Sequence, residues 1–286
     1  MKLLSDFDGV WTNPAEEADA VRRYFVREAI RLAGVDEERG EREFADLRAT
    51  VMASPQEYGW CVEGRLTAYV DEDPFCLPNT IGAFLGRSED PQHRLYREAI
   101  LAAGHASTEA FANHCFFEAT SAFRKERPPA LVPRACEVLE TLMEAGIELV
   151  IVSNSPPEKI EGWFEDVGAH LDHDHFRICG QAGKHELGDD TTVFDVGERS
   201  VRIDRPRYRC VLEEEAPDLV VGDVFSLDLA LPCWLRREGL GGAPRMTILH
   251  RQPHTPSWVM GLAKSGPVDR VIDGIAELVP IVRGHG

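Results

Sequence analysis

The sequence predicts an α/β protein, with a doubly wound parallel sheet and an inserted, mainly helical segment. After about residue 130, short apolar runs rich in β-branched residues alternate with helical patterns, which is the order expected of a doubly wound sheet. Acidic or hydroxyl residues directly follow three of the apolar runs, where the strands of an open parallel sheet place their sites. Between the first run and the others lies a mostly helical stretch, residues 15–129.

The first apolar run, Lys2-Leu3-Leu4, leads directly into Asp6-Phe7-Asp8-Gly9. Gly9 can adopt backbone angles that other residues avoid, so the chain can turn there and keep the two carboxylates together. Clustered carboxylate oxygens are ligands that Mg²⁺ prefers. Beside such a cation, a carboxylate can attack a phosphorus atom without being repelled by its negative oxygens. The end of this first strand is therefore a candidate site.

The inserted segment has the pattern of helices separated by turn residues. Asn13 as N-cap and Pro14 at the first helical position predict a helix start, and Ser54-Pro55 and Pro128-Pro129 predict helix ends. The stretch 57–85 is irregular and rich in aromatic and turn residues, so we expect loop with short elements there. The expected helices are 14–34, 36–52, 91–103 and 107–124.

Strands and helices alternate in the rest of the chain. The continuous apolar runs 148–152 and 219–221 are typical of strands buried on both faces of a parallel sheet. Gly197 marks the turn of a hairpin. The expected strands are 2–4, 148–152, 176–179, 192–196, 200–203, 219–221 and 246–249, and the expected helices are 134–145, 157–167, 207–215 and a closing helix over 268–278.

Three motifs follow strands in a fixed order: Asp6 and Asp8, then Ser153-Asn154-Ser155, then Gly222-Asp223 with Asp228. Each is a common turn sequence when taken alone. Scattered turns, however, do not produce this order directly behind apolar runs. At these residues the chain resembles the haloacid dehalogenase (HAD) superfamily. The resemblance implies a HAD-like catalytic core, residues 1–14 and 130–286, and a helical cap domain, residues 15–129, that closes over the site and excludes water.

The resemblance also implies a role for each motif residue. Asp6 would be the nucleophile that forms an aspartyl-phosphate, and Asp8 would be the general acid and then the general base. Ser153 and Asn154 would bind the transferring phosphoryl group. The implied Mg²⁺ ligands are Asp6, the backbone carbonyl of Asp8, Asp223 and Asp228.

The superfamily also carries a cation, usually a Lys followed by Pro, before the acidic strand. Arg205-Pro206 occupies that place, and an arginine can pair with phosphate or with Asp6 through two hydrogen bonds. Lys184, in a loop after an apolar strand, is the competitor. We favour Arg205, and both residues are candidates for catalysis and phosphate binding.

The expected activity is that of a Mg²⁺-dependent phosphatase, a phosphomonoester hydrolase acting on a small phosphorylated metabolite. Asp8 favours phosphoryl chemistry, because the dehalogenases of the superfamily lack a carboxylate there. The alternatives are a phosphomutase or phosphotransferase of the same fold, and a catalytically retired binding or regulatory module. Several carboxylates held together repel one another without a metal, which argues against a retired site.

The composition of the chain excludes several classes of binding partner. The chain of 286 residues has 31 basic and 49 acidic residues, a formal charge of −18 that repels nucleic acid and anionic membrane surfaces. Its seven cysteines form no Cys-x-x-Cys pair, so neither a zinc site nor a disulfide framework is indicated. No apolar run approaches the roughly 20 residues of a membrane span, and the first strand leaves no room for a leader peptide. We expect a cytoplasmic protein.

Overall fold

The structure is a computed structural model that describes residues 1–127, 130–169, 171 and 174–284. The chain divides into two compact units. The first, which we call the sheet unit, comprises Met1–Asn13, Val62–Ala68 and Pro129–Gly286, and the second, the helical unit, comprises Pro14–Cys61 and Tyr69–Pro128. The expected cap included Val62–Ala68, which the structure groups with the sheet unit instead. The expected Pro128-Pro129 helix end lies outside the described residues.

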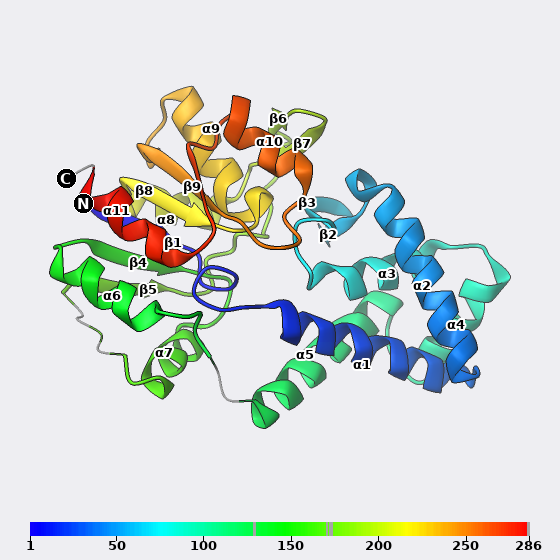
Figure 1. Cartoon of the computed structure of the whole chain (residues 1–286). Coiled ribbons are helices and arrows are strands. Elements are labelled where there is room, and N and C mark those ends of the chain that lie inside the picture. Colours follow the sequence, from blue (N-terminus) through cyan, green and yellow to red (C-terminus); the bar gives the residue numbers. More distant parts are fainter. Residues whose placement is uncertain (128–129, 170, 172–173, 285–286) are drawn as a thin grey trace. The chain divides into compact units, whose positions relative to one another are not determined.

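The sheet unit is built on six strands in the order β10-β9-β8-β1-β4-β5, and every neighbouring pair is parallel (Figure 1). The first strand, β1, lies between β8 and β4. The motif that follows β1 therefore lies between the motifs that follow β8 and β4. The fold class expected from the sequence is confirmed. The strands are β1 (Lys2–Ser5), β4 (Glu148–Val152), β5 (Phe176–Cys179), β8 (Leu219–Gly222), β9 (Met246–His250) and β10 (Arg270–Ile272).

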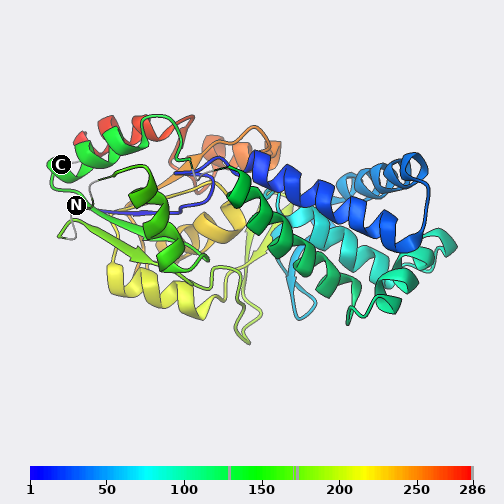
Figure 2. The same ribbon diagram turned by 90° about the horizontal axis from the view of Figure 1, so that it is seen from below.

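Helices cover both faces of this sheet. In Figure 2, α6 and α11 lie on one face and α8 lies on the other. A separate hairpin, β6 (Val193–Val196) with β7 (Arg199–Arg202), turns through Gly197 and Glu198. The helices are α6 (Ala135–Glu144), α7 (Pro157–Asp166), α8 (Pro206–Glu215), α9 (Ala230–Glu238), α10 (Ser257–Ser265) and α11 (Leu278–Arg283).

Apolar side chains of the central strands form the core of the sheet unit. Leu149, Ile151 and Val221 are all buried, and they pack against Leu139 of α6 and Phe164 of α7. Strands buried on both faces lack the alternation of polar and apolar residues, which explains why their continuous apolar runs were recognisable. This packing fixes where each strand ends, and so where the motif residues lie.

The helical unit has a core of its own, centred on aromatic side chains. Phe25, Phe44 and Tyr96 are buried, and the rings of Phe44 and Tyr96 meet edge to face with centroids 5.0 Å apart. In both views α1 and α5 lie side by side (Figures 1 and 2). The helices are α1 (Ala15–Ala33), α2 (Glu37–Ala53), α3 (Cys76–Arg87), α4 (Pro91–Ala102) and α5 (Thr108–Glu126).

Three helix starts in the helical unit are capped by side chains. Asp36 accepts a hydrogen bond from the backbone N–H of Arg39, Asp90 from that of Gln92, and Ser107 from that of Ala110, which is typical of these residue types at an N-cap. The expected cap of the first helix is wrong by one residue. Helix α1 begins at Ala15 with Pro14 in the N-cap position and no side-chain cap.

The stretch 57–85 is more regular than expected. Strands β2 (Gly59–Val62) and β3 (Arg65–Tyr69) pair, and α3 begins at Cys76. The buried residues of α3 face the core of the helical unit, so tertiary packing stabilises a helix whose sequence contains Pro78 and two glycines.

The expected closing helix over 268–278 is wrong. Its first half forms β10, which pairs in parallel with β9. A backbone N–H of Arg251 donates to the carbonyl of Ile272 at 2.8 Å. Pairing at the sheet edge satisfies the backbone N–H and C=O groups of this segment. The turn residues Asp273-Gly274 then end the strand, and helix α11 begins only at Leu278.

Among the described residues, no helix combines the length and the apolar character that crossing a bilayer requires.

Candidate active site

Gly9 makes the sharp turn after β1 possible. Its φ angle is +84°, in the left-handed region that favours glycine. A Cβ atom at this position would lie 2.0 Å from Oδ2 of Asp223. The Gly9 carbonyl lies 2.7 Å from Nδ1 of His250, which can only donate to it. Glycine is therefore required twice, by the backbone angle and by the close approach of the Asp223 carboxylate.

The carboxylates of Asp6, Asp223 and Asp228 come together at the carboxyl ends of β1 and β8. One oxygen from each lies within 4.8 Å of the others. A backbone N–H of Asp6 donates to Val221 at 2.9 Å, which ties the two strand ends together. In the part of the chain that the structure describes, this is the one group of three such side chains close enough to share an ion.

Asp228 is held by an irregular turn rather than by a strand. The π-helical turn Phe225–Leu229 follows β8 directly, and the backbone N–H of Val224 donates to Oδ2 of Asp228 at 3.0 Å. A Cβ atom on Gly222 would lie 2.3 Å from the Cβ of Asp228. Gly222 thus makes room for Asp228.

Lys184 is the cation that meets these carboxylates. Its Nζ lies 2.6 Å from Oδ1 of Asp6 and 2.9 Å from Oδ1 of Asp228, and its side chain is 2% exposed. The ammonium also lies 5.6 Å from the ring centre of Tyr208. Asn154 fixes the lysine backbone, because its Oδ1 accepts from the Lys184 N–H at 2.8 Å.

The crowded carboxylates shift the pKa values of both partners. Burial, and next the neighbouring Asp228, raise the pKa of Asp6 to about 8, although Lys184 opposes the shift. Burial lowers the pKa of Lys184, but the carboxylates of Asp228 and Asp6 outweigh it and raise the pKa above its ordinary value. The ammonium therefore stays charged at neutral pH.

Asp8 lies outside this cluster and has different partners. Its Oδ2 accepts a hydrogen bond from Oγ of Ser155 at 3.3 Å, and its Oδ1 lies 3.7 Å from Nζ of Lys159. The Asp8 side chain is 38% exposed. The two carboxylates of the first motif therefore lie in different surroundings, one buried against Lys184 and one partly open to water.

Ser153 and Asn154 lie at the end of β4. Ser153 is buried, and its Oγ accepts from the backbone N–H of Ser155 at 3.0 Å. Its backbone carbonyl accepts from Ala182 at 2.9 Å, which joins this strand end to the loop that carries Lys184. Asn154 contacts that loop as well, so its observed role is to support Lys184.

Arg205 is buried, and the structure shows it donating to backbone carbonyls. Its guanidinium donates to the backbone carbonyl of Lys184, to that of Thr67 at 2.6 Å, and to that of Ser226 at 3.0 Å. The salt bridge to Asp6 comes from Lys184. These contacts favour Lys184 over Arg205 as the cation beside Asp6, and the arginine donates to the backbone that carries the lysine, because a planar guanidinium can donate to several carbonyls at once.

Sequence reasoning missed two residues of this site. Lys159 lies four residues after Ser155, in the first turn of α7. A lysine in the first turn of the helix that follows the second motif is a feature of the sequence that could have indicated it. Tyr208 donates from its hydroxyl to the Asp228 carbonyl at 2.8 Å. Nothing in the sequence around Tyr208 distinguishes it from a core residue of α8.

The donor set fits a hard divalent cation. Three carboxylates share one buried cluster, and Lys184 supplies a single positive charge against them. Burial, and next the negative charge of Asp228, raise the Asp6 pKa, and oxygen donors of this kind are those that Mg²⁺ takes.

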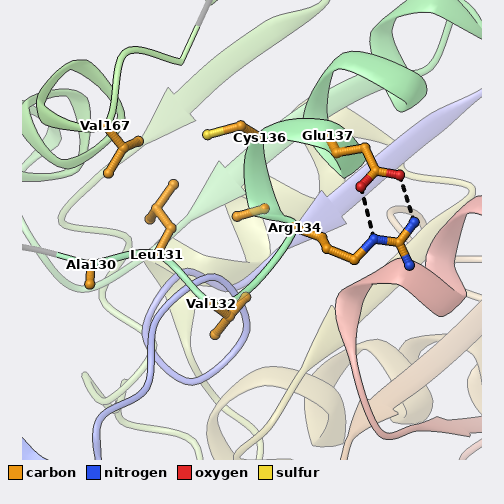
Figure 3. A pocket seen from close by; sticks show the side chains of 8 residues that line it. Ala130, Leu131, Val132, Arg134, Cys136, Glu137 and Val167 are labelled. Atoms are coloured by element: carbon orange, nitrogen blue, oxygen red, sulfur yellow. Dashed lines mark hydrogen bonds and ion pairs between the residues drawn. The ribbon is translucent and has the colours of Figure 1, made fainter.

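A pocket of the sheet unit lies apart from these carboxylates. It has a volume of about 290 Å³ and is lined mainly by apolar side chains around the start of α6. Figure 3 shows the ion pair between Arg134 and Glu137 at this pocket, with two hydrogen bonds of 2.8 and 2.6 Å. None of the carboxylates described above lines it.

No family model matches the chain, and no curated protein matches it. Solved structures do match along nearly the whole chain. CbbY from Rhodobacter sphaeroides in complex with phosphate is 20% identical with a TM-score of 0.47, and the match covers 97% of this chain and 95% of that chain. The putative HAD-hydrolase YfnB from Bacillus subtilis bound to magnesium is 15% identical with a TM-score of 0.47, covering 99% and 98%.

A putative β-phosphoglucomutase from Thermotoga maritima is 13% identical with a TM-score of 0.45, covering 99% of this chain and 98% of that chain. At these identities and TM-scores the likeness says nothing of substrate or reaction.

Proposed function

We propose that this chain, whose fold is HAD-like, is a Mg²⁺-dependent phosphomonoester hydrolase acting on a small phosphorylated metabolite. The observation that supports the proposal most is the contact of Lys184 with Asp6 and Asp228 beside Asp223. A buried cation on a nucleophilic carboxylate, with further carboxylates to hold a metal, is a suitable arrangement for attack on a phosphoryl group.

Asp6 is the proposed nucleophile. One carboxylate oxygen of Asp6 forms a bond to phosphorus while the bond from phosphorus to the leaving oxygen breaks, giving an aspartyl-phosphate. Asp8 donates a proton to the leaving oxygen and then accepts one from the water that attacks the aspartyl-phosphate. Inorganic phosphate leaves, and Asp6 is restored as a carboxylate.

The other residues bind and orient. Lys184 keeps Asp6 in place and neutralises phosphoryl oxygens, and the hydroxyl of Ser153 donates to one of them. Mg²⁺, held by Asp6, Asp223, Asp228 and the carbonyl of Asp8, would supply charge neutralisation at the phosphoryl group. Asn154 and Arg205 contribute by holding the backbone of Lys184.

The proposal is tested by phosphate release from a panel of phosphorylated metabolites with Mg²⁺ present. Wild type should release phosphate from at least one of them, and Asp6→Asn should abolish release because an amide is not a nucleophile of this kind. Asp195→Asn, the same change at an exposed position of β6, is the matched control and should behave as wild type.

Two outcomes would contradict the proposed hydrolase activity. Transfer of phosphate between metabolites without release would make the protein a phosphomutase or phosphotransferase. Tight binding of a phosphorylated metabolite with no turnover would make it a binding module.

A further inference from the structure

Each carboxylate of the first motif has its own lysine. Lys184 meets Asp6, and Lys159 lies 3.7 Å from Oδ1 of Asp8. Lys159 belongs to the first turn of α7, and no step of the proposed reaction uses it. Its Nζ also donates to Oγ of Ser155 at 2.7 Å.

The chemistry of these groups sets the direction of the hydrogen bonds. A lysine ammonium has three donors and no acceptor, so Ser155 must accept from Lys159. The hydroxyl proton of Ser155 is then directed elsewhere, and Oδ2 of Asp8 lies 3.3 Å away to receive it. Both oxygens of the Asp8 carboxylate therefore face a donor, one the hydroxyl and the other the ammonium.

This contact is poorly suited to a purely stabilising role. The side chains of Lys159 and Asp8 are 20% and 38% exposed, and ion pairs with such access to water contribute little to folding. What the contact does achieve is restraint. A carboxylate with a donor facing each oxygen is restricted in its rotation about the last side-chain bond, and general acid catalysis depends on that orientation.

We propose that Lys159 is a positioning residue that acts through Ser155 and Asp8, holding the Asp8 carboxylate for proton transfer to and from the leaving group. The inference rests on the proposed hydrolase function. It assigns to α7 a part in the reaction that none of the superfamily motifs in this chain assigns to it.

The test compares substrates whose leaving groups differ in their need for a proton. Lys159→Met keeps the length of the side chain and removes the charge, and it should lower kcat for alkyl phosphates about tenfold, a part of the roughly 10²–10⁴-fold that general acid–base catalysis contributes. Activated aryl phosphates should lose much less, and KM should change little for both. Lys159→Arg should restore much of the loss, and Glu158→Gln, an exposed neighbour in the same helical turn, is the control for disturbance of the helix start.

A double-mutant cycle decides whether Lys159 acts through Asp8. If it does, Asp8→Asn combined with Lys159→Met should be no slower than Asp8→Asn alone, because the group to be oriented is already gone. Multiplied losses in the double variant, or equal losses on alkyl and aryl phosphates, would overturn the role of Lys159 while leaving the hydrolase intact. Absence of turnover in wild type with every substrate would overturn the hydrolase, and the positioning role with it.

Discussion

Gly9 combines two constraints at a single residue. Its backbone is left-handed, and the space where a Cβ atom would lie is filled by the carboxylate of Asp223. Gly34, at the end of α1, is also left-handed with φ of +62°, but nothing lies within 4 Å of its would-be Cβ. Substitution of Gly34 therefore tests backbone strain alone, whereas substitution of Gly9 tests strain together with displacement of Asp223.

We expect Gly9→Ala to lower the free energy of unfolding by more than Gly34→Ala, for which left-handed strain alone costs about 1–2 kcal/mol. Gly9→Ala should also weaken Mg²⁺ binding, because Asp223 must move away from the new methyl group. Calorimetric titration of Mg²⁺ and urea unfolding would measure both. Unchanged Mg²⁺ affinity in Gly9→Ala would show that Asp223 is not needed at its present position.

Lys184 and Arg205 are both buried cations, but their contacts predict different losses. Lys184→Met should lower kcat by roughly 10² to 10³, the usual effect of removing one preorganised electrostatic group. Arg205→Met should mainly reduce stability, because three backbone carbonyls lose a donor and buried acceptors without partners are costly. Kinetics and urea unfolding of both variants would test this, and a larger kcat loss in a stably folded Arg205→Met protein would return the catalytic role to the arginine.

At the scale of elements, α2 and α4 of the helical unit are joined by one buried polar contact. The hydroxyl of Tyr96 donates to Oε2 of Glu43 at 2.5 Å, and Nε of Arg39 donates to the other oxygen at 2.7 Å. Tyr96 is fully buried and Glu43 nearly so. A buried carboxylate depends on its donors, so this contact fixes how the two helices meet.

Tyr96→Phe should lower the free energy of unfolding by about 1–3 kcal/mol, because it leaves a desolvated carboxylate oxygen with one donor fewer. Tyr58→Phe is the matched control, since Tyr58 packs at the margin of the same core and the structure shows no hydroxyl hydrogen bond for it among the described residues. Urea unfolding measures both variants, and equal stabilities would contradict the assignment.

For the whole molecule, the Asp6 cluster links folding to pH. The pKa of Asp6 is raised from an ordinary value of 3.8 to about 8 in the folded protein. Between these two values the folded state binds a proton that the unfolded state releases. The stability that comes from this proton is complete below about pH 4 and is lost as the pH rises through about 8.

Metal-free protein should therefore become less stable between about pH 4 and about pH 8, and Mg²⁺ should restore stability at the upper end because it binds the folded cluster. Urea unfolding in EDTA and in Mg²⁺ would measure the effect. In Asp6→Asn the contribution of this group should be absent. A wild type and an Asp6→Asn variant with the same pH dependence would show that Asp6 does not carry the shift.

The local patterns were sufficient for the strands other than β2, β3 and β10, for most helices and for the motif residues at the strand ends. The runs 148–152 and 219–221 are apolar because both faces of the central strands are buried, so burial left its mark directly on the sequence. The caps Asp36 and Ser107 act on backbone groups three residues away, so they are contacts between near neighbours in the chain. Each of these features depends on neighbours along the chain.

Only the tertiary structure decided which side chains meet. Lys184 lies 178 residues from Asp6, and the choice between it and Arg205 depended on how two loops pack at the sheet end. The segment 270–272 became a strand because the edge of β9 was free to pair with it, and the contact of Lys159 with Asp8 likewise joins distant parts of the chain. The sequence by itself determined the α/β class and the candidate carboxylates, because these follow from burial and local geometry. The cation on the nucleophile and the partner of Asp8 arise from long-range packing, which adjacent residues do not encode.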